Sequence, residues 1–390
     1  MIKLLKNASV HAPEKLGVVD ILIAGEKIVR IAPHISGMDN LEDVEVLDLG
    51  GALTVPGLID SHVHVTGGGG EIGPVSRVPE MQLSQFTMNG ITTVLGLLGT
   101  DGISRSQEAL ISKTLALTAE GISCYCLAGA YRFPSPSLTG DIARDIALIG
   151  PVIGVKIALS DHRSSNLTLD EFIRLCSDAR LGGVLSGKTG IVVAHMGGGE
   201  AGMKPIFDAI RNSNVPAGTI IPAHCERNER LTRQAAEYTR MGGIADFTAD
   251  AESTSGGTAE SIVRALEAGA DANFITLSSD SGGSLPVFDQ AGHCIGMGVG
   301  TPNGLLLELR RLVRDFGIPL ETALRFLTAN PAKTLGKTGV KGVLAKHADA
   351  DILVLNDDFT VNTLFARGKL MVHEGKPVVF GLFERGIVKP

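Results

Sequence analysis

Histidines and one aspartate stand at positions from which they can bind metal ions. His62 and His64 are one residue apart at the end of an apolar, strand-like run. In a β-strand, residues two apart point to the same face, so both imidazoles can approach one cation. His195, His224 and Asp280 each end a later apolar run. Any one of them alone is more often a hydrogen-bonded core or loop residue, and only their combination favours a metal site.

Lys156 lies inside the apolar run VIGVKIALS. Alternation places Ile153, Val155, Ile157 and Leu159 on one face, suited to a layer of helices, and turns Lys156 to the opposite, interior face. An unpaired ammonium is costly to bury, so this lysine is expected to be paired with a carboxylate, neutral or modified. A neutral amine can react with CO₂ to form a carbamate, an anionic oxygen ligand able to bridge two cations.

The elements that must position these residues alternate between strands and helices. Eight apolar runs are typical of strands, at residues 53–65, 92–99, 123–131, 152–160, 190–196, 220–226, 244–250 and 274–280. Helices are predicted between them, for example at 106–121 and at 169–180, where Thr168 and Glu171 have capping-box spacing. Eight such units predict a closed (β/α)₈ barrel, whose active site lies at the C-terminal ends of its strands. The candidate ligands then gather at the ends of strands 1, 4, 5, 6 and 8.

Both ends of the chain are rich in short strands and weak in helical periodicity. A hairpin is predicted through Gly25 and Glu26. We therefore expect residues 1–52 and 343–390 to form one small β-sandwich domain, and residues 53–342 to form the barrel.

Residues 182–189 fit the phosphate-loop pattern GxxxxGK[ST]. That loop requires a strand before it and a helix after it, whereas here a helical run precedes and a strand follows. The segment is interpreted as a helix-to-strand connection, and Lys188 as a solvated loop lysine.

The composition is typical of a soluble globular enzyme. Of the 390 residues, 44% are hydrophobic and 20% are charged, and the net charge of −7 comes without a basic stripe. No apolar run is long enough to span a bilayer, and the N-terminus lacks the features of a signal peptide. We expect a cytoplasmic protein with neither a nucleic-acid nor a membrane partner.

The motifs around these residues resemble those of the amidohydrolase superfamily, beginning with VPGLIDSHVH. They resemble the isoaspartyl dipeptidases within it through VPGLIDSHVHVTGGGGEIGP, GLLGTD, GAYRFPS, IGVKIALSDHRSS, AHMG, PAHCERN and LSSDSGGS, which follow one another from residue 55 to residue 284. The resemblance implies two divalent metal ions, expected to be Zn²⁺, with a metal-bridging hydroxide as nucleophile. It implies that one ion is bound by His62, His64 and Asp280, that the other is bound by His195 and His224, and that carboxylated Lys156 bridges them.

The resemblance also implies contacts to a dipeptide. Glu71 would hold the free α-amino group of the substrate, and Gly69, Thr100 and Ser284 would help to hold the aspartyl carboxylate. The glycines at 67–70 let the backbone of this loop approach a substrate closely. Judged by residue type alone, the same loop is equally well a flexible surface turn.

Three further side chains follow predicted strands. Arg163 and Arg227 carry planar guanidinium groups that suit carboxylate binding, although a surface ion pair is the commoner role of an arginine. Tyr131 is placed to donate to a developing oxyanion, or else is a packed aromatic. Asp280 is expected to act as general base in addition to binding metal.

The predicted activity is hydrolysis of β-aspartyl (isoaspartyl) dipeptides, with a small dipeptide as the partner molecule. The alternative is a cyclic-amide hydrolase or an N-acyl amino acid deacylase with the same metal centre; a substrate without a free amine has no need of Glu71. An inactive scaffold of the same fold should have lost ligands, and this chain keeps all six. The resemblance also implies a homo-oligomer, an octamer in similar enzymes.

Overall fold

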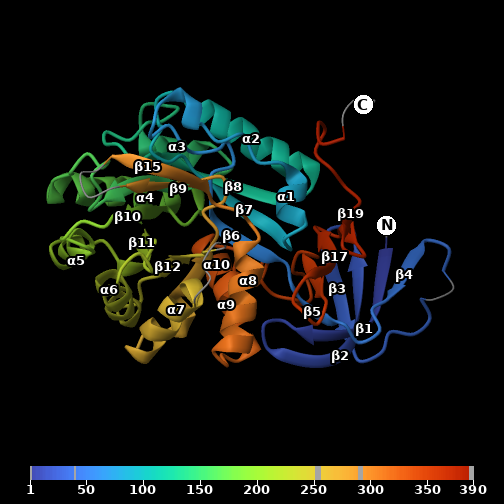
Figure 1. Ribbon diagram of the computed structural model, residues 1–390. Coiled ribbons are helices and arrows are strands. Elements are labelled where there is room, and N and C mark those ends of the chain that lie inside the picture. The colour runs from blue at the N-terminus through green and yellow to red at the C-terminus, as the bar shows by residue number, and fades with distance from the viewer. Residues whose placement is uncertain (1, 39–40, 251–255, 289–292, 386–390) are drawn as a thin grey trace.

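The computed structural model describes residues 2–38, 41–250, 256–288 and 293–385, which form a barrel and a strand-rich domain (Figure 1). The barrel strands are β6 (Leu58–Val63), β7 (Ile91–Gly96), β8 (Ser123–Gly129), β9 (Val152–Leu159), β10 (Ile191–Met196), β11 (Ile220–Ala223), β12 (Ala245–Thr248) and β13 (Ile275–Ser278). Each lies within or overlaps one of the eight predicted runs, and neighbouring strands pair in parallel. The predicted (β/α)₈ barrel is confirmed.

The barrel closes through two irregular seams, because β6 to β11 form one continuous sheet and β12 and β13 form a separate pair. At the first seam, the backbone N–H of Cys225 donates to the carbonyl of Asp246 (3.1 Å), and at the second that of His64 donates to the carbonyl of Ser281 (2.8 Å). The Asp246 carboxylate also accepts a hydrogen bond from Ser61 of β6 (3.4 Å). The second seam brings the ends of β6 and β13 together, and with them three predicted metal ligands, His62, His64 and Asp280.

Helices surround the strands (Figure 1). They are α1 (Leu83–Thr87), α2 (Gln107–Glu120), α3 (Ile142–Leu148), α4 (Leu169–Ser186), α5 (Lys204–Arg211), α6 (Glu229–Arg240), α7 (Gly257–Glu267), α8 (Gly304–Arg310), α9 (Leu320–Leu327) and α10 (Ala329–Thr334), with short 3₁₀ or π turns at Pro74–Ser76, Ala217–Thr219, Ala272–Phe274 and Arg311–Asp315. The helices predicted at 106–121 and 169–180 are α2 and α4. The predicted capping box is present, because Thr168 and Glu171 each accept the other's backbone N–H. Among the described residues, no helix is both long and apolar enough to cross a membrane.

The prediction that Ile153 faces the helices is wrong. A register shift between β8 and β9 pairs Cys126 with Val152 and Leu127 with Gly154, which leaves Ile153 as an extra residue. Such a bulge turns the extra side chain to the other face, and Ile153 packs in the barrel interior. The other three predicted residues do pack in the large cluster shared with the helices: Val155, Ile157 and Leu159.

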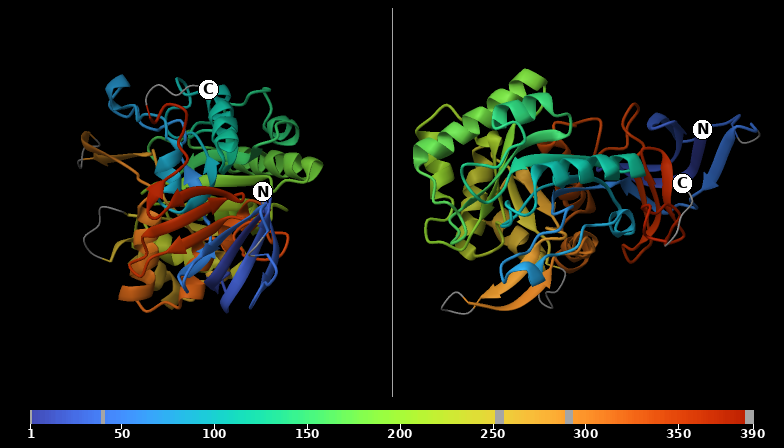
Figure 2. Two further views of the ribbon diagram at one scale, coloured as in Figure 1. Left: turned by 90° about the vertical axis from the view of Figure 1, so that its right-hand side faces the viewer. Right: turned by 90° about the horizontal axis from the view of Figure 1, so that it is seen from above.

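The second domain is built from both ends of the chain, and Figure 2 shows the blue and red strands side by side. Its strands are β1 (Ile2–His11), β2 (Lys15–Ala24), β3 (Lys27–Ala32), β4 (Val44–Asp48), β5 (Leu53–Pro56), β16 (Ile352–Leu355), β17 (Val361–Ala366), β18 (Lys369–His373) and β19 (Lys376–Pro377). Their order is β19-β18-β17-β16-β5-β1-β2-β3, with β4 on β1. The run predicted as one strand at 53–65 divides at Gly57, since β5 pairs with β1 and β16 whereas β6 opens the barrel.

Within the segment 182–189, residues 182–186 are the end of α4 and the rest leads to β10, so the predicted order of helix before strand is confirmed. The prediction of a solvated Lys188 is wrong, because its ammonium is partly buried and donates to three backbone carbonyls. The acceptors are Ile146 (2.6 Å), Ile149 (2.6 Å) and Val152 (3.0 Å). Lys188 therefore satisfies carbonyls at the end of α3 and fixes that helix to the start of β9.

A hairpin of β14 (Ser284–Phe288) and β15 (Cys294–Val299) follows β13 and projects from the barrel (Figure 2). It begins at Ser284, so its first residue stands next to the predicted metal ligands while its remainder extends outward.

Candidate metal centre and active site

The six predicted ligands are all buried and lie in or directly after the barrel strands. Asp280 Oδ1 is 3.0 Å from Nε2 of His64 and 3.5 Å from Nε2 of His62. Candidate ligand atoms of these three residues all lie within 4.8 Å of one another. His224 joins them, with its ring centroid 5.1 Å from that of His62 and 4.5 Å from that of His195. The fold thus brings together residues that are far apart in sequence.

Two of these residues have an unusual backbone conformation. His224 has φ of 66° and Asp280 has φ of 51°, in the left-handed region that non-glycine residues rarely adopt. The turn at Asp280 is stabilised by a neighbouring strand, because the buried carboxylate of Asp60 in β6 accepts a hydrogen bond from the backbone N–H of Ser279 (3.0 Å). Such conformations persist where the surroundings fix them, and they are concentrated at functional sites.

The protonation states suit metal binding. Burial lowers the pKa of His62 and His224 well below the usual range and that of His195 to about 3, so these imidazoles are neutral, as a ligand must be. His224 Nδ1 is 2.8 Å from the hydroxyl of Thr248, while its Nε2 is buried without a hydrogen-bond partner among the described residues. An unpaired buried nitrogen is costly unless something binds it. This set of nitrogen and oxygen donors fits divalent metal ions.

Lys156 is completely buried, with its Nζ 2.8 Å from His62 Nε2. No carboxylate of the described residues forms an ion pair with it, so the expected alternative of a paired ammonium is not found. Burial lowers its pKa to about 7, which leaves much of the lysine as a neutral amine.

A cavity of about 650 Å³ opens beside His64, His195, His224 and Asp280. It is lined by six of the predicted substrate and catalytic residues: Gly69, Thr100, Tyr131, Arg163, Arg227 and Ser284. This volume is in the range of sites that enclose small molecules.

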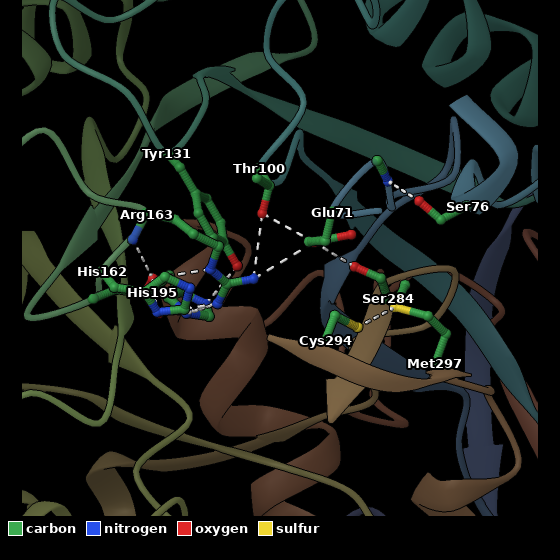
Figure 3. A network of polar contacts seen from close by, with 12 residues as sticks. Glu71, Ser76, Thr100, Tyr131, His162, Arg163, His195, Ser284, Cys294 and Met297 are labelled. Carbon is green, nitrogen blue, oxygen red and sulfur yellow. Dashed lines mark hydrogen bonds and ion pairs between the residues drawn. The ribbon is translucent and has the colours of Figure 1, made fainter. Parts of the chain in front are cut away.

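Glu71 lies where several of these side chains converge (Figure 3). Its Oε1 accepts hydrogen bonds from Thr100 Oγ1 (3.1 Å) and Ser284 Oγ (2.7 Å), with Arg163 Nη1 at 3.5 Å. The side chain is only 4% exposed, and its Oε2 is buried without a hydrogen-bond partner among the described residues. One carboxylate oxygen is therefore fixed by the protein, and the other has no partner among the described residues. Glu71 does not itself line the cavity but contacts Thr100 and Ser284, which do.

The glycine-rich loop is packed, which excludes the alternative of a flexible surface turn. Gly69 has φ of +91°, and a Cβ there would lie 2.0 Å from the carbonyl oxygen of Ser76. Arg105 fixes the position of the loop, because its guanidinium donates to the carbonyls of Gly68 (3.2 Å) and Val78 (2.6 Å). Sequence reasoning missed Arg105, since a single arginine at the start of a helix gives no signal of such a role.

The two predicted carboxylate-binding arginines differ. Arg227 is exposed in the cavity, and its guanidinium makes no hydrogen bond or ion pair within the described part of the chain. Arg163 binds Asp161 through two hydrogen bonds, Nε to Oδ1 and Nη2 to Oδ2, both of 2.9 Å. Tyr131 places its hydroxyl 2.6 Å from His195 Nδ1, and burial raises its pKa, so it stays a donor.

Known proteins share this architecture. The family model described as the amidohydrolase family matches residues 194–371. A β-aspartyl dipeptidase from Fervidobacterium islandicum AW-1, crystallised with the β-Asp-Leu dipeptide, is 39% identical to this chain, with 97% of this chain and 98% of that one aligned at a TM-score of 0.91. The chain belongs to the β-aspartyl dipeptidase family. The similarity to isoaspartyl dipeptidases that the sequence motifs of this chain indicate is thereby confirmed.

One more distant solved structure shows the fold alone, and a further match in sequence covers only a part of the chain. An L-hydantoinase from Arthrobacter aurescens is 15% identical over 97% of this chain and 98% of that one, with a TM-score of 0.70. A dihydroorotase from Bacillus cytotoxicus is 34% identical over 89 residues. That match covers 23% of this chain, and the chain spans only 19% of the length of that enzyme.

Proposed function

We propose that this chain hydrolyses β-aspartyl dipeptides at a binuclear metal centre. The observation that carries the proposal is Glu71, whose buried and unpartnered Oε2 offers an acceptor to an ammonium group beside the metal cluster. A substrate with a free α-amine next to the scissile bond requires such a group, whereas a cyclic amide or an N-acyl amino acid does not. The similarity to an enzyme crystallised with β-Asp-Leu supports the same substrate class.

In the proposed centre, His62, His64 and Asp280 would hold one ion, His195 and His224 would hold the second, and carboxylated Lys156 would serve as a ligand to both. Two divalent ions, expected to be Zn²⁺, would supply Lewis-acid chemistry by lowering the pKa of a coordinated water and polarising the scissile carbonyl. Support for the carbamate comes from the completely buried Lys156 side chain, which lacks a carboxylate partner among the described residues and reaches His62.

The remaining residues position the dipeptide. Glu71 binds the α-ammonium. The hydroxyls of Thr100 and Ser284, which donate to Glu71 in this structure, turn to donate to the aspartyl carboxylate, together with the backbone at Gly69. Because its guanidinium has no partner among the described residues, Arg227 is well suited to bind a carboxylate of the substrate.

Proton transfer is assigned to two groups. Tyr131 donates its hydroxyl hydrogen to the oxygen of the scissile carbonyl as negative charge develops there. Asp280 takes a proton from the attacking water and gives it to the leaving amine as the C–N bond breaks, which releases aspartate and the second amino acid. Burial alone would raise the pKa of Asp280, but the hydrogen bond from His64 brings it below its usual range, so the base is ionised.

We further propose a homo-oligomer in the cytoplasm, with neither a membrane nor a nucleic acid as partner. Support for self-association comes from Leu181, Val184 and Leu185, which are exposed together on one face of α4.

A substrate panel with metal analysis tests the proposal. It consists of β-Asp-Leu, α-Asp-Leu, dihydroorotate, hydantoin and an N-acetyl amino acid, with zinc measured per chain. We expect turnover of the β-aspartyl dipeptide alone and two ions per chain. Replacing His64 by Ala should abolish turnover, while replacing His34, whose side chain is 67% exposed and outside the cavity, should not. Preferred turnover of a cyclic amide or an N-acyl amino acid would establish the alternative activity instead.

A further inference from the structure

Asp161 is a buried carboxylate next to the proposed second metal site, and no role has yet been given to it. It follows β9 at the C-terminal face of the barrel and is 8% exposed. Its Oδ2 is 3.1 Å from Nε2 of His195, and both of its oxygens accept from Arg163. The backbone N–H of Arg163 adds a further hydrogen bond to Oδ1 (2.8 Å). The carboxylate is thus fixed on one side by an arginine and faces a proposed metal ligand on the other.

These contacts determine which nitrogen of His195 carries the proton. A neutral imidazole has one N–H, and an ionised carboxylate can only accept a hydrogen bond, so the proton belongs on Nε2, facing Asp161. Arg163 Nη2 lies 3.3 Å from the same nitrogen, but it donates to Asp161 Oδ2 over a shorter distance of 2.9 Å. Nδ1 is then the acceptor, and its single lone pair, which takes the Tyr131 hydroxyl hydrogen here (2.6 Å), is the one that a cation would occupy when that hydroxyl turns to the substrate.

We propose that Asp161 is a positioning residue for the second metal ion: it holds His195 with the proton on Nε2, so that Nδ1 presents its lone pair to the cation. The inference rests on the proposed binuclear centre. A carboxylate hydrogen-bonded to the far nitrogen of a metal-bound imidazole fixes the orientation of the ring and increases its basicity.

The same geometry changes the expected role of Arg163. Its Nε and Nη2 hold Asp161, and only Nη1 is directed to the substrate site, 3.3 Å from Thr100 and 3.5 Å from Glu71. Arg163 is therefore primarily the partner of Asp161 and connects the support of a metal ligand to the site that recognises the substrate. Arg227, by contrast, has no such partner among the described residues.

The test measures metal affinity rather than turnover. Metal-free wild-type protein and its D161N variant are titrated with Zn²⁺ in competition with a chromophoric chelator, which yields stepwise binding constants. Asn keeps the shape of the side chain but loses its charge. Loss of such a partner typically weakens metal binding by about 10- to 100-fold, and we expect this decrease in one of the two constants only. D208N, the same change at a carboxylate of α5 that pairs with Lys204 and lies outside the cavity, should leave both constants unchanged.

A double-mutant cycle identifies the route of the effect. In an H195A background the D161N change should cause no further loss of affinity, because the imidazole on which Asp161 acts is absent. Equal zinc-binding constants for D161N and wild type would overturn the proposal. So would a loss of zinc affinity on adding D161N to H195A that is as large as the loss caused by D161N in the wild type. A lower melting temperature of metal-free D161N, with both constants decreased together, would instead show a purely structural role and overturn it too. If the wild type binds a single ion, the binuclear centre itself is wrong, an outcome that the wild-type titration reveals by itself.

Discussion

Replacing Glu71 by Gln tests recognition of the substrate's free amine. The amide keeps the size of the side chain, and its oxygen can still accept from Ser284, but it has no charge to pair with an α-ammonium. Since the side chain is only 4% exposed, water cannot screen or replace the lost interaction. A hydrogen bond to a charged group is worth about 1.5–3 kcal/mol, which corresponds to a loss of about 10- to 150-fold in kcat/KM.

The variant also weakens the attraction to Arg163, whose Nη1 lies 3.5 Å from Glu71, so a lower kcat/KM alone does not identify the amine contact. The assay therefore compares β-Asp-Leu with its N-acetyl derivative in wild type and variant. Wild type should prefer the free amine by about 10- to 150-fold, and the variant should have lost most of this preference. Glu80→Gln, at a carboxylate whose side chain is 53% exposed, serves as the matched control. An equal decrease for both substrates in the Glu71 variant would refute the reasoning.

Three other predictions concern the metal centre and the junction of the domains. Asp280→Asn keeps a ligating oxygen but cannot accept a proton, so kcat should fall by about 10²–10⁴-fold with zinc content unchanged; near-normal turnover would contradict the general-base role. Lys156→Ala should lose most activity and recover part of it with short carboxylic acids that supply the missing oxygens, and a failure of every such acid to restore turnover would count against a bridging carbamate. Buried Lys341 binds Asp349 (2.8 Å) and Asp351 (2.6 Å), so Lys341→Met should destabilise the fold by about 3–5 kcal/mol, measured by thermal melting. Burial alone would raise the pKa of Asp349, but Lys341 brings it below its usual range. The stabilisation is therefore present at neutral pH and is lost as the pH falls through the lowered pKa. An equal difference in unfolding free energy between wild type and variant at neutral and at strongly acidic pH would exclude this account.

The barrel strands can be predicted because each is buried on both faces and therefore forms an apolar run. Their exact extent cannot, because it depends on pairing partners that are distant in sequence. A Cβ at Gly57 would lie 2.4 Å from the side chain of Thr92, and at this glycine the chain passes from one sheet to the other. The Pro56-Gly57 pair indicates a turn in this run, but the residues around it do not show that its two halves join different sheets. The bulge at Ile153 is equally invisible, since it is set by the register of β8 against β9.

The cluster of candidate metal ligands can be predicted because histidines at strand ends are informative both by type and by position. Asp161, Arg105 and Lys188 cannot, because their roles depend on backbone and side-chain groups that only the fold places beside them. In sequence, Asp161 lies in the polar stretch SDHRSS, which is typical of a solvated turn. Only the pairing of β9 with β10 brings it within 3.1 Å of His195.

The terminal sheet has a consequence for the order in which the chain can fold during synthesis. β5 pairs with β1 on one side and with β16 on the other, and the whole barrel is translated between these two neighbours. Until β16 leaves the ribosome, one edge of β5 therefore exposes unpaired backbone groups, the kind of edge that recruits strands from other chains. The pairing of β16 with β5 covers this edge, and it joins residues that are very far apart in sequence. Pairings between such distant residues form late in folding. The nascent chain consequently keeps this open edge of β5 through the synthesis of the entire barrel, and the edge is covered only when β16 is added.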